Sequence, residues 1–428
     1  MNLPAPFLQE MKKKLGEKFP DFLQSYAYPA QKGIRVNTLK LSPEEFRAIS
    51  PFSLEEIAWE KNGFYVKEEK VGAHPYHFAG LYYSQEPSAM SAAPLLDAGE
   101  GERVLDLCAA PGGKTTRLAE GMRGKGILVA NEYVYDRAKI LSQNVERLGI
   151  KNCFVVNADT GKLAEKFPAY FDKILVDAPC SGEGMFKKEP SALLEWSEEN
   201  VARCATRQAE ILENAAKMLK GGGRLVYSTC TFSTAENEGQ IETFLRLHPE
   251  FSLLQMHALY PHEVRGEGHF VALLEKKGAE EGRVRPFAVK RNASAERAFQ
   301  DFCNKFFRTP PQGTLHVLSD GRGYLLPDGA PDFVGLRLLR AGVEVGEWDG
   351  KIFKPSHALC MCAKKEDVYN CVSLTEQEAE TYLRGEVLDC EGENGWCLMT
   401  LDGFPLGLGK RVNGRIKNHL PKGLRKVK

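Results

Sequence analysis

The chain has 428 residues, which is long enough for two or three domains of roughly 100–200 residues each. It carries 57 lysine and arginine residues against 57 aspartate and glutamate residues, so its overall charge excludes a uniformly basic protein and does not by itself indicate a nucleic-acid partner. No secretory signal is visible in the sequence and no apolar run approaches the roughly 18 residues of a membrane span. We therefore expect a cytoplasmic protein whose 11 cysteines are reduced.

The first 80 residues predict a small α+β region. The expected elements are a helix at 7–15, a strand at 33–39 and a helix that opens at 42–46 with a capping serine. Arg35 and Asn37 are polar residues on the expected strand. They could contact RNA, although side chains that simply face outward are the more ordinary interpretation.

From residue 103 to about 274, short apolar runs alternate with helical patterns. Strands are expected at 104–107, 127–130, 154–156, 173–176, 225–228 and 271–274, and helices at 114–120, 136–148, 201–219 and 236–247. This alternation predicts an α/β domain over residues 81–276, built on a doubly wound, mostly parallel sheet. Ligands of such sheets bind outside the carboxyl ends of the strands.

The first of these strand ends carries the run Asp-Leu-Cys-Ala-Ala-Pro-Gly-Gly-Lys-Thr at 106–115. A turn that leads from a strand into a helix exposes backbone N–H groups and a positive helix end, which suit an anionic ligand. A nucleoside triphosphate, a dinucleotide and S-adenosylmethionine compete for this turn. The glycine spacing matches neither the phosphate-cradling loop nor the dinucleotide turn, which leaves the methyl donor.

The other strand ends carry acidic residues and thiols. Glu132 follows the second strand, where an acidic group commonly binds ribose hydroxyls, and Asp159 follows the third, where it could accept from an adenine amino group. Cys180 follows Asp177-Ala-Pro, and Cys230 follows Ser-Thr. Each residue alone could be a cap or a turn residue, but five such ends along one predicted edge favour a site.

Two thiols on neighbouring strand ends suit the methylation of cytosine carbon 5. That carbon is a poor nucleophile, and addition of a thiolate to carbon 6 creates an enamine that can attack a methyl donor. Asp177 could bind the N3 and N4 edge of the base, and Lys114 could orient groups in the same cavity. The base must leave its stack to enter such a pocket. The spacing does not say which thiol is the nucleophile.

The remaining chain predicts two further regions after a charged linker at 276–282. Residues 285–350 should form an intermediate α+β region, with a helix at 296–307 and a strand at 336–339. Residues 351–428 end in a basic run that contains Lys410, Arg411, Arg415, Lys417, Lys422, Arg425, Lys426 and Lys428. Such a run is either a polyanion-binding surface or a solvated tail. The cysteines at 360–397 do not match a usual zinc spacing, so we expect no metal.

Three motifs of this chain resemble those of a known family and occur in the same order as in that family. They are the run at 106–115, Asp-Ala-Pro-Cys-Ser-Gly-Glu-Gly at 177–184 and Tyr-Ser-Thr-Cys-Thr at 227–231. They resemble the Sun-type (NOP-like) RNA cytosine-5 methyltransferases. Residues 35–38 resemble the N-terminal motif of that family, and residues 409–421 resemble the PUA-like end of its RsmF-like bacterial branch.

The resemblance implies a Rossmann-like class I methyltransferase sheet, a small α+β N-terminal domain and a β-rich, PUA-like, RNA-binding C-terminal region. It implies that Cys230 is the nucleophile and that Cys180 assists product release, whereas the Pro-Cys cysteine, at the position of Cys180, is the nucleophile of DNA cytosine-5 methyltransferases. The implied contacts of S-adenosyl-L-methionine are Cys108, Ala109, Ala110, Pro111, Gly112, Gly113, Lys114, Glu132, Asp159 and Asp177.

The predicted function is transfer of a methyl group to carbon 5 of cytosine in RNA, through a covalent cysteine–cytosine adduct. The resemblance favours 16S ribosomal RNA, free or in the 30S particle, as the substrate of a monomeric enzyme, with neither DNA nor a membrane as a partner. Transfer RNA is the alternative substrate. A ribosome assembly factor that binds RNA without turnover is the alternative function.

Overall fold

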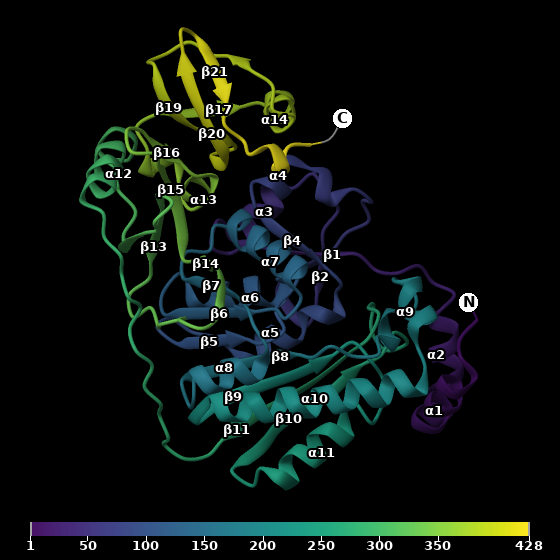
Figure 1. The fold of residues 1–428 in the computed structure, drawn as a ribbon. Coiled ribbons are helices and arrows are strands. Elements are labelled where there is room, and N and C mark those ends of the chain that lie inside the picture. Colours follow the sequence, from purple (N-terminus) through teal and green to yellow (C-terminus); the bar gives the residue numbers. More distant parts are fainter. Residues whose placement is uncertain (1, 427–428) are drawn as a thin grey trace.

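The computed structural model describes residues 2–426, which form four sheets (Figure 1). The N-terminal region carries α1 (Ala5–Leu15), α2 (Phe19–Ser25), α3 (Pro43–Ile49) and α4 (Pro75–Phe78). Its sheet has the order β2-β3-β1-β4, with β1 at Gly33–Val36, β2 at Glu55–Ile57, β3 at Glu60–Tyr65 and β4 at Tyr82–Gln85. Strand β4 belongs to this sheet although it lies beyond residue 80, the boundary that the sequence predicts for the N-terminal region. Ser42 caps α3 as its position predicts, because its hydroxyl accepts from the Glu45 N–H at 3.1 Å.

Arg35 and Asn37 are buried, so the expectation that they face outward or contact RNA is wrong. Strand β1 lies inside its sheet, and the Arg35 side chain, which is 1% exposed, points at α6 (Gly113–Met122). Its guanidinium donates to Glu120, Gln85, Thr116 and the Gly113 carbonyl at 2.6–3.1 Å. Asn37 donates to the carbonyls of Gly80 and Leu148. Both residues therefore join the N-terminal region to the central domain.

The central sheet has eight strands in the order β10-β11-β9-β8-β5-β6-β7-β14. The strands are β5 (Arg103–Asp106), β6 (Ile127–Asn131), β7 (Cys153–Asn157), β8 (Phe171–Asp177), β9 (Leu219–Thr229), β10 (Phe251–Leu259), β11 (His269–Lys276) and β14 (Arg337–Ala341). Strands β5 to β9 are parallel, and the other three are antiparallel to their neighbours. The predicted Rossmann-like sheet is confirmed.

Helices cover both faces of this sheet and enclose two hydrophobic cores. They are α5 (Ala92–Leu96), α6, α7 (Tyr135–Arg147), α8 (Thr160–Lys166), α10 (Glu198–Met218) and α11 (Glu238–Leu247). The short α9 (Pro190–Glu195) packs instead with α1 and α2. Leu105 and Val129 face a core with Leu212 of α10, whereas Val104 faces a core with Leu118 of α6. Side chains alternate between the two faces along each strand, and both faces are buried under helices. These strands therefore appear in the sequence as continuous apolar runs and not as alternating patterns. In residues 2–426 no helix is long and apolar enough to cross a membrane.

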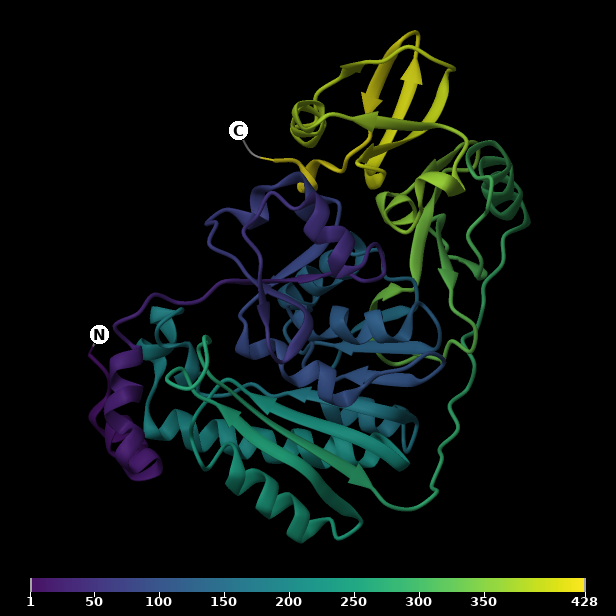
Figure 2. The ribbon, with the colours of Figure 1, turned by 180° about the vertical axis from the view of Figure 1, so that it is seen from behind.

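The C-terminal half forms two further sheets above the central domain (Figure 2). The first contains β12 (Thr314–Val317), β13 (Arg322–Leu326), β15 (Val343–Trp348) and β16 (Phe353–Pro355), with α12 (Ala293–Phe306) and α13 (His357–Met361). The second contains β17 (Cys371–Leu374), β18 (Leu388–Asp389), β19 (Gly395–Leu401), β20 (Phe404–Val412) and β21 (Arg415–Asn418), with α14 (Glu376–Leu383). The expected strand at 336–339 is β14, which leaves this half of the chain and pairs with β7.

The basic run near the C-terminus is not a loose tail. Lys410 and Arg411 lie on β20, and Arg415 and Lys417 lie on β21. Arg411 is buried and donates to the Glu393 carbonyl at 3.2 Å, so it holds the sheet together. The other three are exposed on the sheet, and Lys428 lies outside the described residues. The basic side chains therefore have fixed positions.

Replacing Arg35 should destabilise the protein strongly. Arg35→Ala leaves the buried Glu120 carboxylate without its ion-pair partner, which should lower the free energy of unfolding by roughly 3–5 kcal/mol in urea denaturation. Arg47→Ala is the matched control because the Arg47–Glu56 pair lies at the surface, and it should cost about 1 kcal/mol or less. Equal losses in the two variants would contradict a structural role for Arg35.

Candidate active site

The turn after β5 begins with Asp106, a fully buried carboxylate. Its Oδ2 accepts from the Thr115 hydroxyl at 2.6 Å, and its Oδ1 has no hydrogen-bond partner among the described residues. Burial raises the pKa of Asp106 to about 7, although the hydrogen bond from Thr115 opposes the shift. An unpartnered buried carboxylate oxygen requires an explanation, and a ligand group at this turn would supply one.

The N-terminus of α6 faces the same turn. Its N-cap is Gly112, whose φ of 114° favours glycine, and this residue offers the helix no side-chain cap. The first N–H groups of α6 and the helix dipole thus remain available for a carboxylate. Together with the free oxygen of Asp106, which could accept from an amino group, they fit the amino-acid end of the predicted methyl donor.

Hydrogen bonds fix the rest of the turn against its neighbours. Ala109 donates its N–H to the Asn131 carbonyl, and the carbonyls of Ala110 and Pro111 accept from Arg137 and Asn144. Cys108 is partly buried, and burial together with the charges of Asp106, Asp177 and Glu132 raises the pKa of its thiol well above the usual value. Cys108 is therefore a neutral thiol that lines the turn.

The next two strand ends carry the acidic residues predicted for the nucleoside. Glu132, at the end of β6, is buried, and one of its carboxylate oxygens accepts from the Val134 N–H at 2.9 Å. Asp159, after β7, is exposed and caps α8 by accepting from the Gly161 N–H at 2.8 Å. Both lie beside the turn after β5, since β5, β6 and β7 are neighbours in the sheet.

Asp177 and Lys114 form an ion pair at the end of β8. Lys114 Nζ lies 2.7 Å from Asp177 Oδ2, and the Ser228 hydroxyl donates to Oδ1 at 2.8 Å. Burial alone would raise the pKa of Asp177, but Lys114 and the other donors outweigh it and lower that pKa. Asp177 is therefore an ionised hydrogen-bond acceptor, about a third of whose side chain reaches solvent.

The two predicted thiols meet directly. Cys180 Sγ lies 3.1 Å from Cys230 Sγ, and both cysteines are unbridged and partly exposed. The hydrogen bond to Cys230, burial and the nearby Glu236 carboxylate raise the pKa of Cys180 well above the usual value. Cys180 is thus the more strongly protonated thiol, and a hydrogen bond joins the two sulfurs.

Glu236 holds the two cysteine loops together, a role that the sequence did not reveal. Its buried carboxylate accepts from the N–H and hydroxyl of Ser181 and from Gln208 Nε2. The Ser181 hydroxyl also lies 2.8 Å from that of Thr231, so the carboxylate links the residues that follow Cys180 and Cys230. Glu236 was expected to begin a helix, but α11 begins at Glu238.

His269 is a second residue that sequence reasoning missed. It opens β11, is 2% exposed, and its Nε2 lies 3.9 Å from Asp177 Oδ1. Burial and the Lys114 charge lower its pKa to about 3, so the imidazole is neutral, and within residues 2–426 neither ring nitrogen has a hydrogen-bond partner. A strand pattern gives no sign of this, because the antiparallel direction of β11 brings its first residue to the site.

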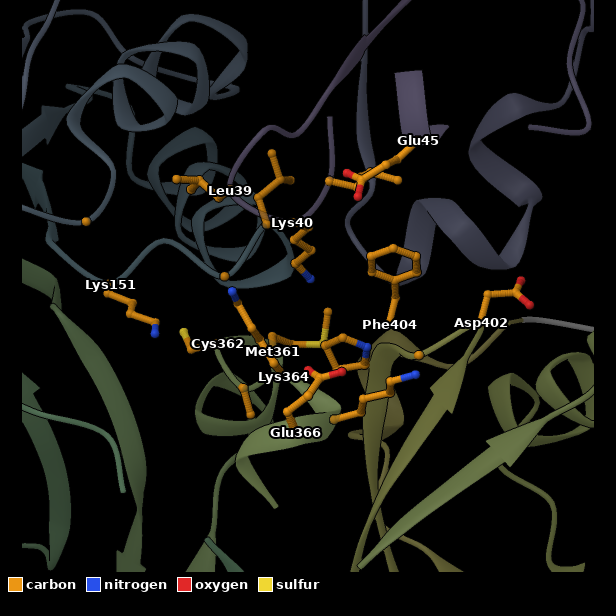
Figure 3. Close-up of a pocket in the computed structure, with 18 of the residues that line it drawn as sticks. Leu39, Lys40, Glu45, Lys151, Met361, Cys362, Lys364, Glu366, Asp402 and Phe404 are labelled. Atoms are coloured by element: carbon orange, nitrogen blue, oxygen red, sulfur yellow. The ribbon is translucent and has the colours of Figure 1, made fainter. Parts of the chain in front are cut away.

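A separate cavity of about 420 Å³ lies elsewhere (Figure 3). Lys40 of the N-terminal region, Lys151 before β7, Lys364 after α13 and Phe404 of β20 line it. None of its described lining residues belongs to the predicted site, and Lys151 precedes β7, at the opposite edge of the sheet. Among residues 2–426 no group of three or more His, Cys, Asp or Glu side chains could hold a metal ion.

Comparisons with known proteins agree with this arrangement. The family described as 16S rRNA methyltransferase RsmB/F matches residues 93–275, and the N-terminal domain of 16S rRNA methyltransferase RsmF matches residues 3–87. The RsmF first C-terminal domain and the RsmF PUA domain match residues 301–362 and 369–426.

Full-length relatives and solved structures point the same way. A protein of Aliivibrio fischeri named ribosomal RNA small subunit methyltransferase F is 34% identical over 99% of this chain and 97% of its own. A protein of Escherichia coli O157:H7 with the same name is 33% identical over 98% of this chain and 96% of its own. The structure of a methyltransferase homologue from Pyrococcus horikoshii is 29% identical, with a TM-score of 0.55 over 64% of this chain and all of its own.

The methyl donor of these enzymes is S-adenosylmethionine, which fits the uncapped end of α6 and the carboxylates beside it. The PUA match accounts for the β-rich C-terminal sheet. The four matches follow one another along almost the whole chain, in the order of the folded regions. The chain therefore belongs to the RsmF family of S-adenosylmethionine-dependent ribosomal RNA methyltransferases.

Proposed function

We propose that this chain methylates carbon 5 of a cytosine in 16S ribosomal RNA through a covalent adduct with Cys230. The observation that carries the proposal is the pair of unbridged thiols, 3.1 Å apart, beside an ionised Asp177. A pair of thiols suits cytosine carbon 5, because that carbon requires a nucleophile at carbon 6 before it can accept a methyl group. The names of the relatives support 16S ribosomal RNA as the substrate.

S-adenosylmethionine supplies an electrophilic methyl group in this reaction. Cys230 adds as a thiolate to carbon 6, and the electron pair of the broken double bond makes carbon 5 nucleophilic. After methylation, the proton on carbon 5 leaves to a base or to water, the sulfur–carbon bond breaks, and its electrons return to Cys230. Cys180, which keeps its proton, donates to that sulfur and stabilises it as a leaving group.

Asp177 selects cytosine in this proposal. Its carboxylate accepts a hydrogen bond from the exocyclic amino group. As the adduct forms, water would supply a proton to N3, which then donates to the same carboxylate, and this proton returns to water when the adduct breaks down. Uracil would present a carbonyl oxygen in place of the amino group and would be repelled by the carboxylate. Lys114 keeps Asp177 ionised and in place through the 2.7 Å ion pair. Cys108 to Gly113, Glu132 and Asp159 would hold the donor.

The flanking regions would choose the RNA. We propose that residues 1–80 and 351–428, whose sheets share one hydrophobic core, bind RNA beside the catalytic domain at 81–276, with 285–350 as an intermediate region. We also propose that a monomer acts in the cytoplasm on RNA of the 30S particle. The exposed cations of β20 and β21 support a nucleic-acid contact in the last region.

The adduct can be trapped on RNA that contains 5-azacytosine. Cys230→Ala should abolish the methylation-dependent adduct, whereas Cys180→Ala should retain it. On RNA with ordinary cytosine, Cys180→Ala should accumulate an adduct because release is slowed. Cys371→Ala is the matched control, since it removes a partly exposed thiol of β17, which lies in another sheet. Denaturing gel electrophoresis detects the adduct. An adduct that survives in Cys230→Ala but not in Cys180→Ala would make Cys180 the nucleophile and reverse the assignment.

The substrate can be identified in a strain that lacks the gene. Bisulfite sequencing of total RNA should show that a 5-methylcytosine of 16S ribosomal RNA is lost and returns with the wild-type gene but not with Cys230→Ala. Loss confined to transfer RNA would favour that substrate instead. If the purified protein transfers no tritium from S-adenosylmethionine to either class of RNA, the protein is better explained as a ribosome assembly factor that binds RNA without turnover.

The cations of the C-terminal sheet should contribute to the salt dependence of RNA binding. Replacing Lys410, Lys417 and Lys422 by glutamine should flatten the slope of log affinity against log salt by about two, because each phosphate contact releases counterions. The matched control replaces the exposed Arg246 and Lys277 near the other edge of the central sheet. A slope that is equal in both variants would contradict an RNA contact on this sheet.

A further inference from the structure

An exposed aromatic segment follows Glu132 at the carboxyl edge of the central sheet. Tyr133 is 72% exposed and Tyr135 is 39% exposed, with Val134 exposed between them. Large apolar side chains that gather at the surface of a protein often mark an interaction site. The backbone of this segment is fixed, because Asn157 Nδ2 donates to the carbonyls of Glu132 and Tyr133 at 2.8 and 2.7 Å.

A cation from the C-terminal half completes this surface. Strand β14 pairs with β7 so that Arg337 lies opposite Asn157 (Figure 1). Its guanidinium carbon lies 3.9 Å from the centre of the Tyr135 ring, and Lys139 Nζ lies 4.7 Å from the same centre. In the described part of the chain no acidic residue pairs with Arg337, whose side chain is exposed. A planar cation held over an aromatic ring is a surface on which nucleic-acid bases stack.

The position of this surface relates it to the thiols. Strand β6 precedes Tyr133, and β5 and β8 separate it from β9, which precedes Cys230. Three steps between neighbouring strands separate β9 from β6, and two more separate β6 from β14, which carries Arg337. The surface therefore lies roughly 15–25 Å from Cys230, a distance that a few nucleotides of unstacked RNA can bridge. Both groups lie at the carboxyl ends of parallel strands, so one strand of RNA can reach both.

We propose that Tyr133, Tyr135, Lys139 and Arg337 bind single-stranded RNA next to the target cytosine. One base stacks on the Tyr135–Arg337 pair, and Arg337 neutralises a neighbouring phosphate. Lys139, whose ammonium group also pairs with Asp136 at 2.7 Å, adds a second positive charge beside the ring. The proposal rests on the proposed function, because it needs a target base that enters the thiol pocket from an unpaired strand. Single-stranded RNA is favoured over a duplex, whose bases offer no free face, and over a protein, because the proposed reaction already brings RNA to this edge of the sheet.

Tyr133 has a second possible role that the test must separate. It directly follows Glu132, so its ring is close enough to cover the nucleoside of the methyl donor. Tyr135 and Arg337 lie farther along and do not share that role. The experiment therefore uses Tyr135→Ala and Arg337→Gln, and it measures the KM for RNA and the KM for S-adenosylmethionine separately.

Both variants should bind a fluorescently labelled, single-stranded oligocytidine RNA about tenfold more weakly than the wild type, because they lose a stacking contact. Their KM for RNA should rise by a similar factor, while the KM for S-adenosylmethionine and the melting temperature stay unchanged. Affinity for a hairpin of matched length should change much less. Tyr369→Ala is the matched control, since Tyr369 is an exposed tyrosine that also pairs with an arginine, Arg308, at 5.5 Å.

Unchanged RNA affinity in Tyr135→Ala and Arg337→Gln would overturn the proposal, as would an equal loss in Tyr369→Ala or a rise in the KM for the donor alone. If the wild type methylates RNA and both variants keep its KM, the surface is wrong and the proposed function stands. If the wild type binds RNA through Tyr135 but transfers no methyl group, the proposed function is wrong and the surface stands.

Discussion

The pairing of β8 with β9 is the constraint on which the site depends. These parallel strands place Asp177 opposite Ser228, so the loops that follow begin side by side and their cysteines meet at 3.1 Å. Side chains alternate between the faces of a sheet, and a shift of one residue would turn Asp177 away from Lys114. Glu236 then closes the two loops on each other through Ser181. Sheet register and one buried carboxylate together set the distance between the sulfurs.

Burial is the main reason why several groups at this edge hold their protons more tightly. It raises the pKa values of Asp106, Glu236 and Cys108, and the nearby Asp106 carboxylate adds to the shift of Cys108. The hydrogen bond to Cys230, burial and then the Glu236 carboxylate raise the pKa of Cys180. Asp177 behaves differently because Lys114 lies beside it and lowers its pKa. Asp177 is therefore fixed as an acceptor, whereas Cys180 holds its proton more tightly than an ordinary cysteine.

The sequence predicts the residues of the candidate site better than it predicts the residues that hold them in place. The turn at 106–115, Asp177 and the two cysteines follow strands that local patterns identify, and the rule for parallel sheets brings them to one edge. The inward direction of Arg35 depends on α6, which lies far along the chain and which no local pattern links to β1. Glu236 and His269 reach the site from outside its motifs through tertiary folding, so spacing along the chain could not place them.

Strand β14 joins the C-terminal sheets, which we propose help to choose the RNA, to the central sheet that carries the candidate site. By pairing with β7 it covers an edge of the sheet that would otherwise expose unpaired backbone groups. It also ties the C-terminal sheets to the strands that carry the site. Those sheets cannot rotate freely about the catalytic domain without breaking this pairing. RNA held by the C-terminal cations would therefore lie at a fixed distance from Cys230, so the proposed enzyme would select its cytosine by distance along the folded RNA as well as by the hydrogen bonds of Asp177.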